Sequence, residues 1–289
     1  MTSKVNRLKR DERGYPEVLR NIPSPPQQIF WLGANPDSWL DKPRVAIVGS
    51  RKISNYGREV TRSLAGDLAA AGVVIISGLA LGVDSVAHQS ALEATGLTIA
   101  VMPSGLDQIY PTSHTNLARQ ILTGGGSLIS EYDIGMPPLK QNFIARNRLV
   151  SGLADALLIT EATSISGSLH TARFALDQGK TVLAVPGNIT NPGSEGTNNL
   201  IKSGALPVTG TEDIFFALNL RPTAKKQFRV FRGQPDEEKV LVLIRGGLGA
   251  QEDLAIKADL DGPAISSILT LLEIGGYIKP IGGGQWIAQ

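Results

Sequence analysis

Between residues 44 and 210 the sequence alternates short apolar runs with amphipathic segments, and this alternation limits the chain to few folds. The apolar runs lie at 45–48, 73–76, 97–102, 127–130, 156–160, 181–185 and 206–208. Because they are apolar almost throughout, they predict strands buried on both faces, as in a parallel sheet covered by helices. The segments between them predict helices at 57–71, 82–95, 113–123, 141–153, 167–178, 195–203 and 211–218. We therefore predict a doubly wound, mostly parallel α/β domain over residues 44–220.

The segments outside this domain differ from it in composition. Residues 1–43 form a proline-rich lead-in segment whose apolar run at 29–32 predicts an added edge strand. Residues 221–235 contain two prolines and five basic residues without an apolar period, so they predict a basic linker. Residues 236–289 predict a small winged-helix-like domain, with helices at 237–245, 251–258 and 263–274 and a hairpin turned by Gly282, Gly283 and Gly284.

The composition excludes several classes of protein. With 42% hydrophobic and 19% charged residues the chain can bury a core, which excludes a disordered or fibrous protein. It has no cysteine, so disulfide scaffolds, cysteine-ligated metals and thiol nucleophiles are excluded. No apolar run approaches the roughly 18–20 residues of a membrane span, and the N-terminal segment is charged. We therefore expect a cytoplasmic protein with no membrane partner.

The net charge of +2 is unevenly distributed along the chain. Residues 45–220 carry 11 basic and 13 acidic residues, 221–232 carry 5 basic residues and no acidic one, and 233–289 carry 4 basic and 8 acidic residues. Overall charge therefore does not indicate a nucleic-acid partner, and such a partner would have to meet a local cluster of cations.

The residues that directly follow the predicted strands are small and polar. Examples are Gly49-Ser50-Arg51 after 45–48, Ser77-Gly78 after 73–76 and Glu161-Ala162 after 156–160. Ligands of open parallel sheets bind outside these carboxyl ends, where glycine lets a ligand approach and helix amino ends offer sites for anions. Glycines at these positions could also serve only to form tight turns between strands and helices. Because several strands end in this way, we favour a ligand-binding site at this edge of the sheet.

No catalytic motif accompanies this edge. No GxGxxG dinucleotide fingerprint follows a predicted strand, and the nucleophile elbow GxSxG is missing. Asp84 and His88 are one helical turn apart, which favours a local hydrogen bond over a catalytic pair. We therefore expect no enzyme activity, no cofactor and no metal site.

The segment from Lys140 to Arg148 contains three cations, one aromatic residue and no acidic residue. Cations that neutralise phosphates beside an aromatic ring that stacks a base are typical of proteins that hold single strands without reading their sequence. The alternative is structural: on a helix, Phe143 and Arg146 share a face with Val150, so Phe143 could belong to the core and Arg146 could be a buried, paired residue. Lys140 and Arg148 fall on the opposite side and are expected to point outward.

At these residues the sequence resembles the DNA-processing protein A family (DprA, also called Smf). The similar motifs run from about residue 11 to the C-terminus: DERGYPEVLRNIPSPPQQIFWLG, AIVGSR, SGLALGVDSVAH, PSGLDQIYP, ISEY, NFIARNR, ITEATSISGSLHTA, VPGN and SEGTNNLIKSGA. The resemblance implies an extended Rossmann-like domain that binds single-stranded DNA, helps deliver RecA recombinase onto it in natural transformation or recombination, and performs no known catalysis. It also implies a homodimer, with single-strand-binding protein as a further expected partner.

Carried over by position, the family's contacts to single-stranded DNA fall on Gly49, Ser50, Arg51, Lys140, Phe143, Arg146 and Arg148. Two features depart from the family pattern. The helical N-terminal module of many members is missing, and His170 replaces the usual aliphatic residue in SGSLHTA. Whatever that module contributes elsewhere is not expected here.

Two other functions compete with this hypothesis. SEGTNNLI resembles the PGGxGTxxE motif of the related phosphoribohydrolases that release cytokinin bases, but Leu200 stands where that motif has its glutamate. The general acid or base is thereby lost.

A winged helix could instead read duplex DNA, but 262–276 has no Lys or Arg to meet phosphates. Its apolar stripe of Ile265, Ile268, Leu269 and Leu272 predicts a contact with another protein.

Overall fold

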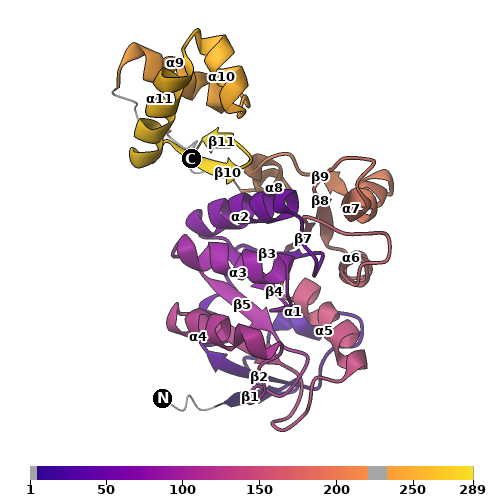
Figure 1. Ribbon diagram of the computed structural model, residues 1–289. Coiled ribbons are helices and arrows are strands. Elements are labelled where there is room, and N and C mark those ends of the chain that lie inside the picture. The colour runs from indigo at the N-terminus through magenta and orange to yellow at the C-terminus, as the bar shows by residue number, and fades with distance from the viewer. Residues whose placement is uncertain (1–4, 221–232, 289) are drawn as a thin grey trace. The chain divides into compact units, whose positions relative to one another are not determined.

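One sheet organises the first of two units, residues 1–222 and 223–289, in the computed structural model, which describes residues 5–220 and 233–288 (Figure 1). Its described strands are β1 (Asn6–Lys9), β2 (Gln28–Gly33), β3 (Arg44–Val48), β4 (Val74–Ser77), β5 (Thr98–Val101), β6 (Ser127–Ser130), β7 (Ala156–Ile159), β8 (Thr181–Ala184) and β9 (Leu206–Pro207). The order is β1-β2-β6-β5-β4-β3-β7-β8-β9, parallel from β6 to β9. The predicted mostly parallel α/β sheet is thus confirmed.

The sequence predicted that the run at 29–32 forms an edge strand of the sheet. This prediction is wrong. The run lies within β2, which pairs antiparallel with β6 on one side and with β1 on the other. The edge strand is β1, whose residues are mostly exposed and polar, so it lacks the apolar signal by which strands are recognised. The sequence analysis missed it for that reason.

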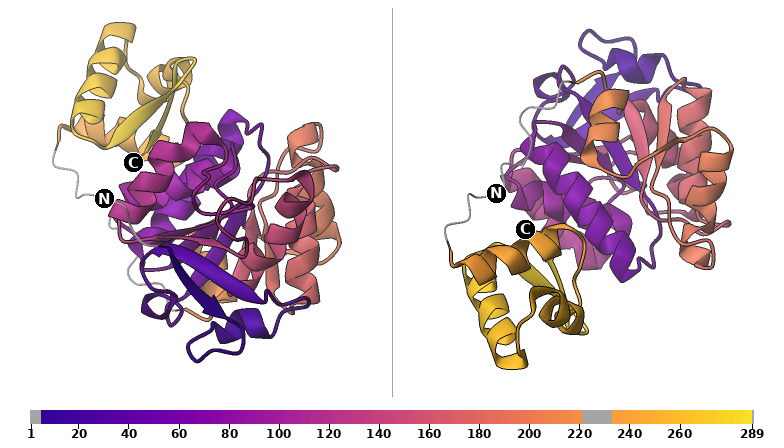
Figure 2. Two further views of the ribbon diagram at one scale, coloured as in Figure 1. Left: turned by 90° about the horizontal axis from the view of Figure 1, so that it is seen from below. Right: turned by 90° about the horizontal axis from the view of Figure 1, so that it is seen from above.

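Helices cover both faces of the sheet, as the views from below and above also show (Figure 2). One layer contains α2 (Asn55–Ala70), α3 (Val83–Glu93), α4 (Thr115–Thr123) and α8 (Thr211–Ala217). The other contains α1 (Glu17–Arg20), α5 (Lys140–Gly152), α6 (Ser168–Asp177) and α7 (Pro192–Lys202). Short 3-10 turns lie at Pro36–Ser38 and Thr112–His114.

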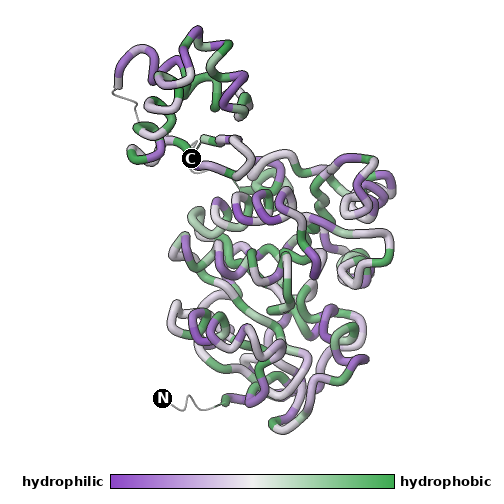
Figure 3. Tube along the Cα trace, in the orientation of Figure 1, coloured by the Kyte–Doolittle hydropathy of each residue, from purple (hydrophilic) through white to green (hydrophobic). Residues whose placement is uncertain are grey.

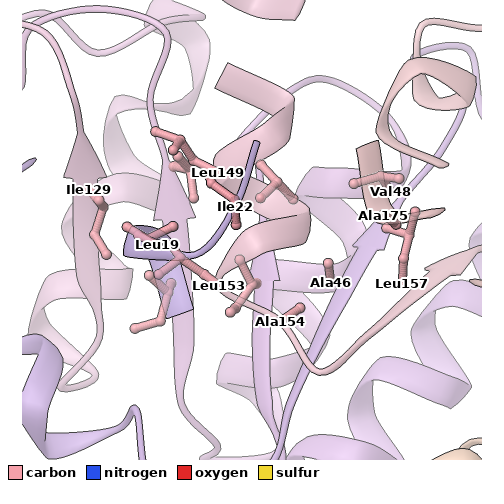
Figure 4. Close-up of a cluster of buried hydrophobic side chains, with 14 of the residues drawn as sticks. Leu19, Ile22, Ala46, Val48, Ile129, Leu149, Leu153, Ala154, Leu157 and Ala175 are labelled. Atoms are coloured by element: carbon pink, nitrogen blue, oxygen red, sulfur yellow. The ribbon is translucent and has the colours of Figure 1, made fainter. Parts of the chain in front are cut away.

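The continuous apolar strands require this double cover. Hydrophobic residues gather along the strands of the sheet (Figure 3), and β3 to β6 are buried at every position. Leu149 and Leu153 of α5 belong to one buried cluster that also includes Leu19 from the lead-in segment and Leu157 of β7 (Figure 4). The lead-in segment therefore belongs to the core that positions α5.

The strand order reverses direction between β3 and β7. From β3 the next strands along the chain extend the sheet through β4 and β5 to β6, whereas β7, β8 and β9 extend it the other way. Loops that leave the carboxyl ends of β3 and β7 therefore turn to opposite faces, and such a switch point opens a crevice.

The second unit contains α9 (Pro235–Arg245), α10 (Gln251–Ala258) and α11 (Gly262–Ile274), followed by an antiparallel hairpin of β10 (Ile278–Gly282) and β11 (Gln285–Ala288). This is the element order predicted for a winged helix. The apolar stripe of Ile265, Ile268, Leu269 and Leu272 is buried in the unit's own core, packed with residues of α9 and α10. It does not form a surface for another protein, so that part of the sequence interpretation is wrong.

Among the described residues, no helix combines the length and the apolar character that crossing a membrane requires. The predicted basic linker at 221–235 lies mostly outside the described residues, and Pro235 begins α9.

Candidate functional site

A large cleft opens at the carboxyl ends of β3 and β7, where the strand order reverses. Its volume is about 1160 Å³. It is lined by the loop at 48–54, by Tyr110, by residues of α5 and by the segments 163–168 and 191–193. These segments are far apart in sequence and meet because parallel strands end at the same edge.

Three cations with exposed side chains line this cleft: Arg51, Lys52 and Lys140. Arg51 and Lys52 belong to the loop after β3, whereas Lys140 is the first residue of α5. The sheet thus places cations from two distant segments around one opening. Exposed cations of this kind can neutralise phosphates.

Phe143 lies half-buried in the cleft between two other side chains. The Arg51 guanidinium carbon is 5.4 Å from the centroid of the Phe143 ring, which is a cation–π contact. The Tyr110 ring meets Phe143 edge-on, with centroids 5.2 Å apart and planes inclined at 72°. Phe143 is therefore not a core residue, and Arg51 holds a position against one face of its ring.

Gly49 and Ser50 shape the floor of the cleft. A side chain at Gly49 would place its Cβ 2.6 Å from the carbonyl oxygen of Glu161, so glycine is required for close packing of the two loops. The backbone N–H of Ser50 donates to that same carbonyl at 2.8 Å. Its hydroxyl donates to the carbonyl of Lys52 at 2.9 Å. These contacts fix the loop that carries Arg51.

Arg146 belongs to the lining of the cleft, but it is buried. Its side chain is 3% exposed, and its Nη1 donates to the carbonyl oxygens of Gly78, at 2.8 Å, and of Val101. Burial lowers the pKa of Arg146 to about 10, while the charge of Asp84 acts in the opposite direction. The structure therefore supports the alternative of a buried, paired arginine.

The buried network around Arg146 includes Asp84. The Asp84 carboxylate accepts hydrogen bonds from the backbone N–H groups of Gly78, at 3.0 Å, and Ala80, at 3.3 Å. Burial raises its pKa, and the charge of Arg146 opposes that increase. A Cβ at Gly78 would lie 2.6 Å from Arg146 Nη2, so the glycine makes room for the guanidinium.

Arg148 was predicted to point outward, but its side chain is bonded to other residues of the protein. Its Nη1 and Nη2 form a bidentate ion pair with the two carboxylate oxygens of Glu131, at 2.5 and 2.6 Å. Its Nε also donates to the carbonyl of Ser24 at 2.8 Å. Glu131 and Ser24, which bond to Arg148, are distant from it in sequence, so helical periodicity could not predict this pairing.

Lys52, Tyr110 and Glu161 also line the cleft, although the sequence predicted no role for them. Lys52 follows Arg51 directly, and Tyr110 stands in PSGLDQIYP, which was noted only for its resemblance. Glu161 directly follows the predicted strand at 156–160, and in the structure it is 4% exposed and lines the cleft. Its position directly after an apolar strand was the available signal.

Asp84 and His88 do not act as a pair. His88 is fully buried, and its Nδ1 lies 2.7 Å from the hydroxyl of Thr98. Because that hydroxyl donates to the carbonyl of Ile75, Nδ1 is the donor of the histidine contact. Burial lowers the pKa of His88 to about 3. Neither side chain is arranged for proton transfer to the other, and no cluster of three metal-ligating residues is present in the described part of the chain.

The cleft thus combines exposed cations with a half-buried aromatic ring. The cations can bind successive phosphates, and the ring can stack a base once the Arg51 guanidinium moves from its face. This combination is typical of proteins that hold single strands.

Comparisons with known proteins show the family to which the chain is similar. The model of the family described as DNA recombination-mediator protein A matches residues 6–219. Protein Smf of Escherichia coli (strain K12) is 42% identical over 282 residues, which cover 95% of this chain and 75% of that protein. DNA processing protein DprA of Streptococcus pneumoniae is 42% identical over 205 residues, which cover 69% of this chain and 70% of that protein.

Two solved structures are similar in both sequence and fold. The X-ray structure of DprA from Streptococcus pneumoniae aligns with a TM-score of 0.69 at 38% identity, covering 74% of each chain. The structure of DNA processing protein A from Helicobacter pylori aligns with a TM-score of 0.67 at 34% identity, covering 75% of this chain and 97% of that chain. The latter structure concerns the single-stranded DNA binding mode of the Helicobacter pylori protein.

The buried position of Arg146 generates a stability prediction. Replacing it in Arg146→Met leaves the Asp84 carboxylate buried without its opposing charge, which we expect to lower the free energy of unfolding by about 3–5 kcal/mol. The Asp84 pKa then rises further, so the native state takes up a proton more readily than the unfolded state. The deficit relative to wild type should therefore shrink as the pH falls toward about 4. Urea denaturation at several pH values measures both effects.

Arg119→Met provides the control, because Arg119 is an exposed arginine of α4 outside the cleft. We expect it to change the free energy of unfolding by less than about 0.5 kcal/mol at any of these pH values. An Arg146→Met protein as stable as the control would contradict a paired, buried role for Arg146.

Proposed function

The chain belongs to the DNA recombination-mediator protein A family, and from this premise we propose that it binds single-stranded DNA without sequence preference and delivers a RecA-type recombinase onto the strand. The observation that carries the binding proposal is the arrangement of Arg51, Lys140 and Phe143 around one cleft at the sheet edge. Phosphates would meet Arg51, Lys52 and Lys140, and a base would stack on Phe143. We propose no direct DNA contact for Arg146 or Arg148, because Arg146 is buried and bonded to backbone carbonyls and Arg148 is paired with Glu131.

The exposed cations of the cleft predict a specific salt dependence. If Arg51, Lys52 and Lys140 each neutralise one phosphate, log affinity for a single strand should fall with log salt at a slope of about −2. Arg51→Ala and Lys140→Ala should each weaken binding of all sequences alike and reduce the size of the slope by about 0.7. Filter binding of oligothymidine and a mixed-sequence strand at several ionic strengths measures this.

The matched control for these variants is Arg119→Ala, because that exposed arginine lies outside the cleft. It should leave affinity and salt slope near those of the wild type. If the wild type binds the strand and neither Arg51→Ala nor Lys140→Ala weakens binding, the strand binds elsewhere on the molecule and this assignment is refuted.

The further partners are proposed from family membership. They are a RecA-type recombinase, a second copy of this chain in a homodimer and single-strand-binding protein, all met in the cytoplasm. The role in natural transformation is proposed on the same basis.

We also propose that the chain is not an enzyme. The segment SEGTNNLI lies in α7, and Leu200 there is an aliphatic residue that cannot transfer a proton. Incubation of the protein with AMP should therefore release no adenine above the uncatalysed background, as measured by chromatography. Sustained release of adenine would favour the phosphoribohydrolase alternative.

The second unit is proposed to add little to DNA affinity. Residues 233–289 carry 4 basic and 8 acidic residues, and α11 contains no Lys or Arg. Because nonspecific affinity comes from phosphate neutralisation, removal of 233–289 should change oligothymidine affinity by less than about tenfold. The comparison requires truncated and full-length proteins of the same verified oligomeric state. A larger loss would assign DNA contacts to this unit.

A further inference from the structure

The amino end of α2 is occupied by a side chain from elsewhere in the protein. Ser54 caps this helix, and its hydroxyl accepts a hydrogen bond from the N–H of Gly57 at 3.0 Å. The N–H of Ser54 donates to both carboxylate oxygens of Glu161, at 3.1 and 3.2 Å, and the Ser54 hydroxyl donates to Glu161 Oε2. Glu161 follows β7 and is 107 residues away in sequence.

This arrangement reproduces a capping box with one member replaced. In a capping box, a glutamate three residues into the helix accepts from the N–H of the capping residue. Here that helix position is Gly57, and a Cβ on it would lie 2.2 Å from Glu161 Oε2. The missing side chain leaves the space that the Glu161 carboxylate fills.

The Glu161 carboxylate also lies beside the amino end of α7. A Cβ at Gly193, in the first turn of that helix, would be 3.4 Å from Glu161 Oε1. The carboxylate therefore lies near the positive ends of two helix dipoles, a position that stabilises an anion. It is 4% exposed although it lines the cleft.

Rossmann-type folds that bind nucleotides place a phosphate at the amino end of the helix that follows the first strand of the sheet. In this sheet the helix at the switch point after β3 is α2. Its capping N–H and hydroxyl already bond to Glu161, whose carboxylate occupies the place that a phosphate would take.

We propose that Glu161 is a specificity residue, whose carboxylate takes the place of a phosphate at the amino end of α2 and excludes free nucleoside monophosphates from the cleft. This inference rests on the proposed function, because it describes how the same cleft prefers a strand to a single nucleotide. The phosphates of a strand bind farther out, at Arg51, Lys52 and Lys140. Glu161 also holds the Arg51 loop, through its contacts with Ser50 and Ser54.

The test removes the carboxylate and supplies a phosphate in its place. Glu161→Ala vacates the site, and isothermal titration with AMP or inorganic phosphate, at constant ionic strength, should show binding at least about tenfold tighter than to wild type, equivalent to about 1.4 kcal/mol. Phosphate should also raise the thermal midpoint of Glu161→Ala more than that of wild type. Glu161→Ser, which keeps a hydroxyl near Ser54, serves as the second variant if the alanine protein does not fold.

Two controls separate occupancy of the site from loss of a negative charge. Glu161→Gln fills the same volume with a neutral amide, and Glu195→Ala removes an exposed carboxylate from the first turn of α7. Both should bind AMP as weakly as the wild type. The proposal would be overturned if folded Glu161→Ala or Glu161→Ser bound AMP and phosphate no more tightly than the wild type. It would also be overturned if Glu195→Ala gained as much affinity for AMP as Glu161→Ala.

Oligothymidine binding, measured in the same preparations, distinguishes the two proposals. If the wild type fails to bind oligothymidine, the proposed function is wrong, whereas the AMP titrations still decide the role of Glu161. If oligothymidine binds and Glu161→Ala gains no affinity for AMP or phosphate, the specificity role alone is wrong.

Discussion

The pairing of β3 with β7 is the interaction on which the site depends. Val48 and Ile159 lie opposite each other at the carboxyl ends of these parallel strands. The hydrogen bond from Ser50 to the carbonyl of Glu161 extends the contact beyond the last paired residues. Because the connections from the two strands cover opposite faces, the loops separate after this point and a cleft opens between them. Arg51 and Lys52 lie on the loop that leaves β3, so their position in the cleft follows from that separation.

Charges around the cleft divide into buried and exposed groups with different roles. Arg146 and Arg148 direct their donors to carbonyls and to Glu131, so they stabilise the segments that frame the cleft. Lys140 and Arg51 keep their charged groups exposed, where counterions can be exchanged for phosphates. Burying a cation costs free energy, and hydrogen-bond and ion-pair partners inside the protein offset that cost. Because these partners occupy the cation, it does not bind a ligand. Burial therefore separates Arg146 and Arg148 of α5 from the exposed Lys140 of the same helix.

Much of the fold could be predicted from the sequence, because its signals are local. Apolar runs identified β3 to β9, and helical segments were placed to within a few residues of α2 to α8. The edge strand β1 was missed because its exposed, polar residues give no such signal. The stripe on α11 was correctly recognised as apolar but assigned to a surface, since periodicity identifies an apolar face without showing what covers it.

The sequence by itself determined the alternating architecture, the family and the residue types at the carboxyl edge of the sheet, including Arg51, Lys140 and Phe143. It could do so because strand burial and the order of motifs depend on residues that are close together in the sequence. Tertiary structure decided which charged residues are exposed and which are bonded within the protein. Arg146 turns to Gly78 and Val101, Arg148 turns to Glu131, and Glu161 reaches the amino end of α2. These partners are distant in sequence and meet only when the sheet forms, and a charged side chain's pairing depends on its neighbours in space.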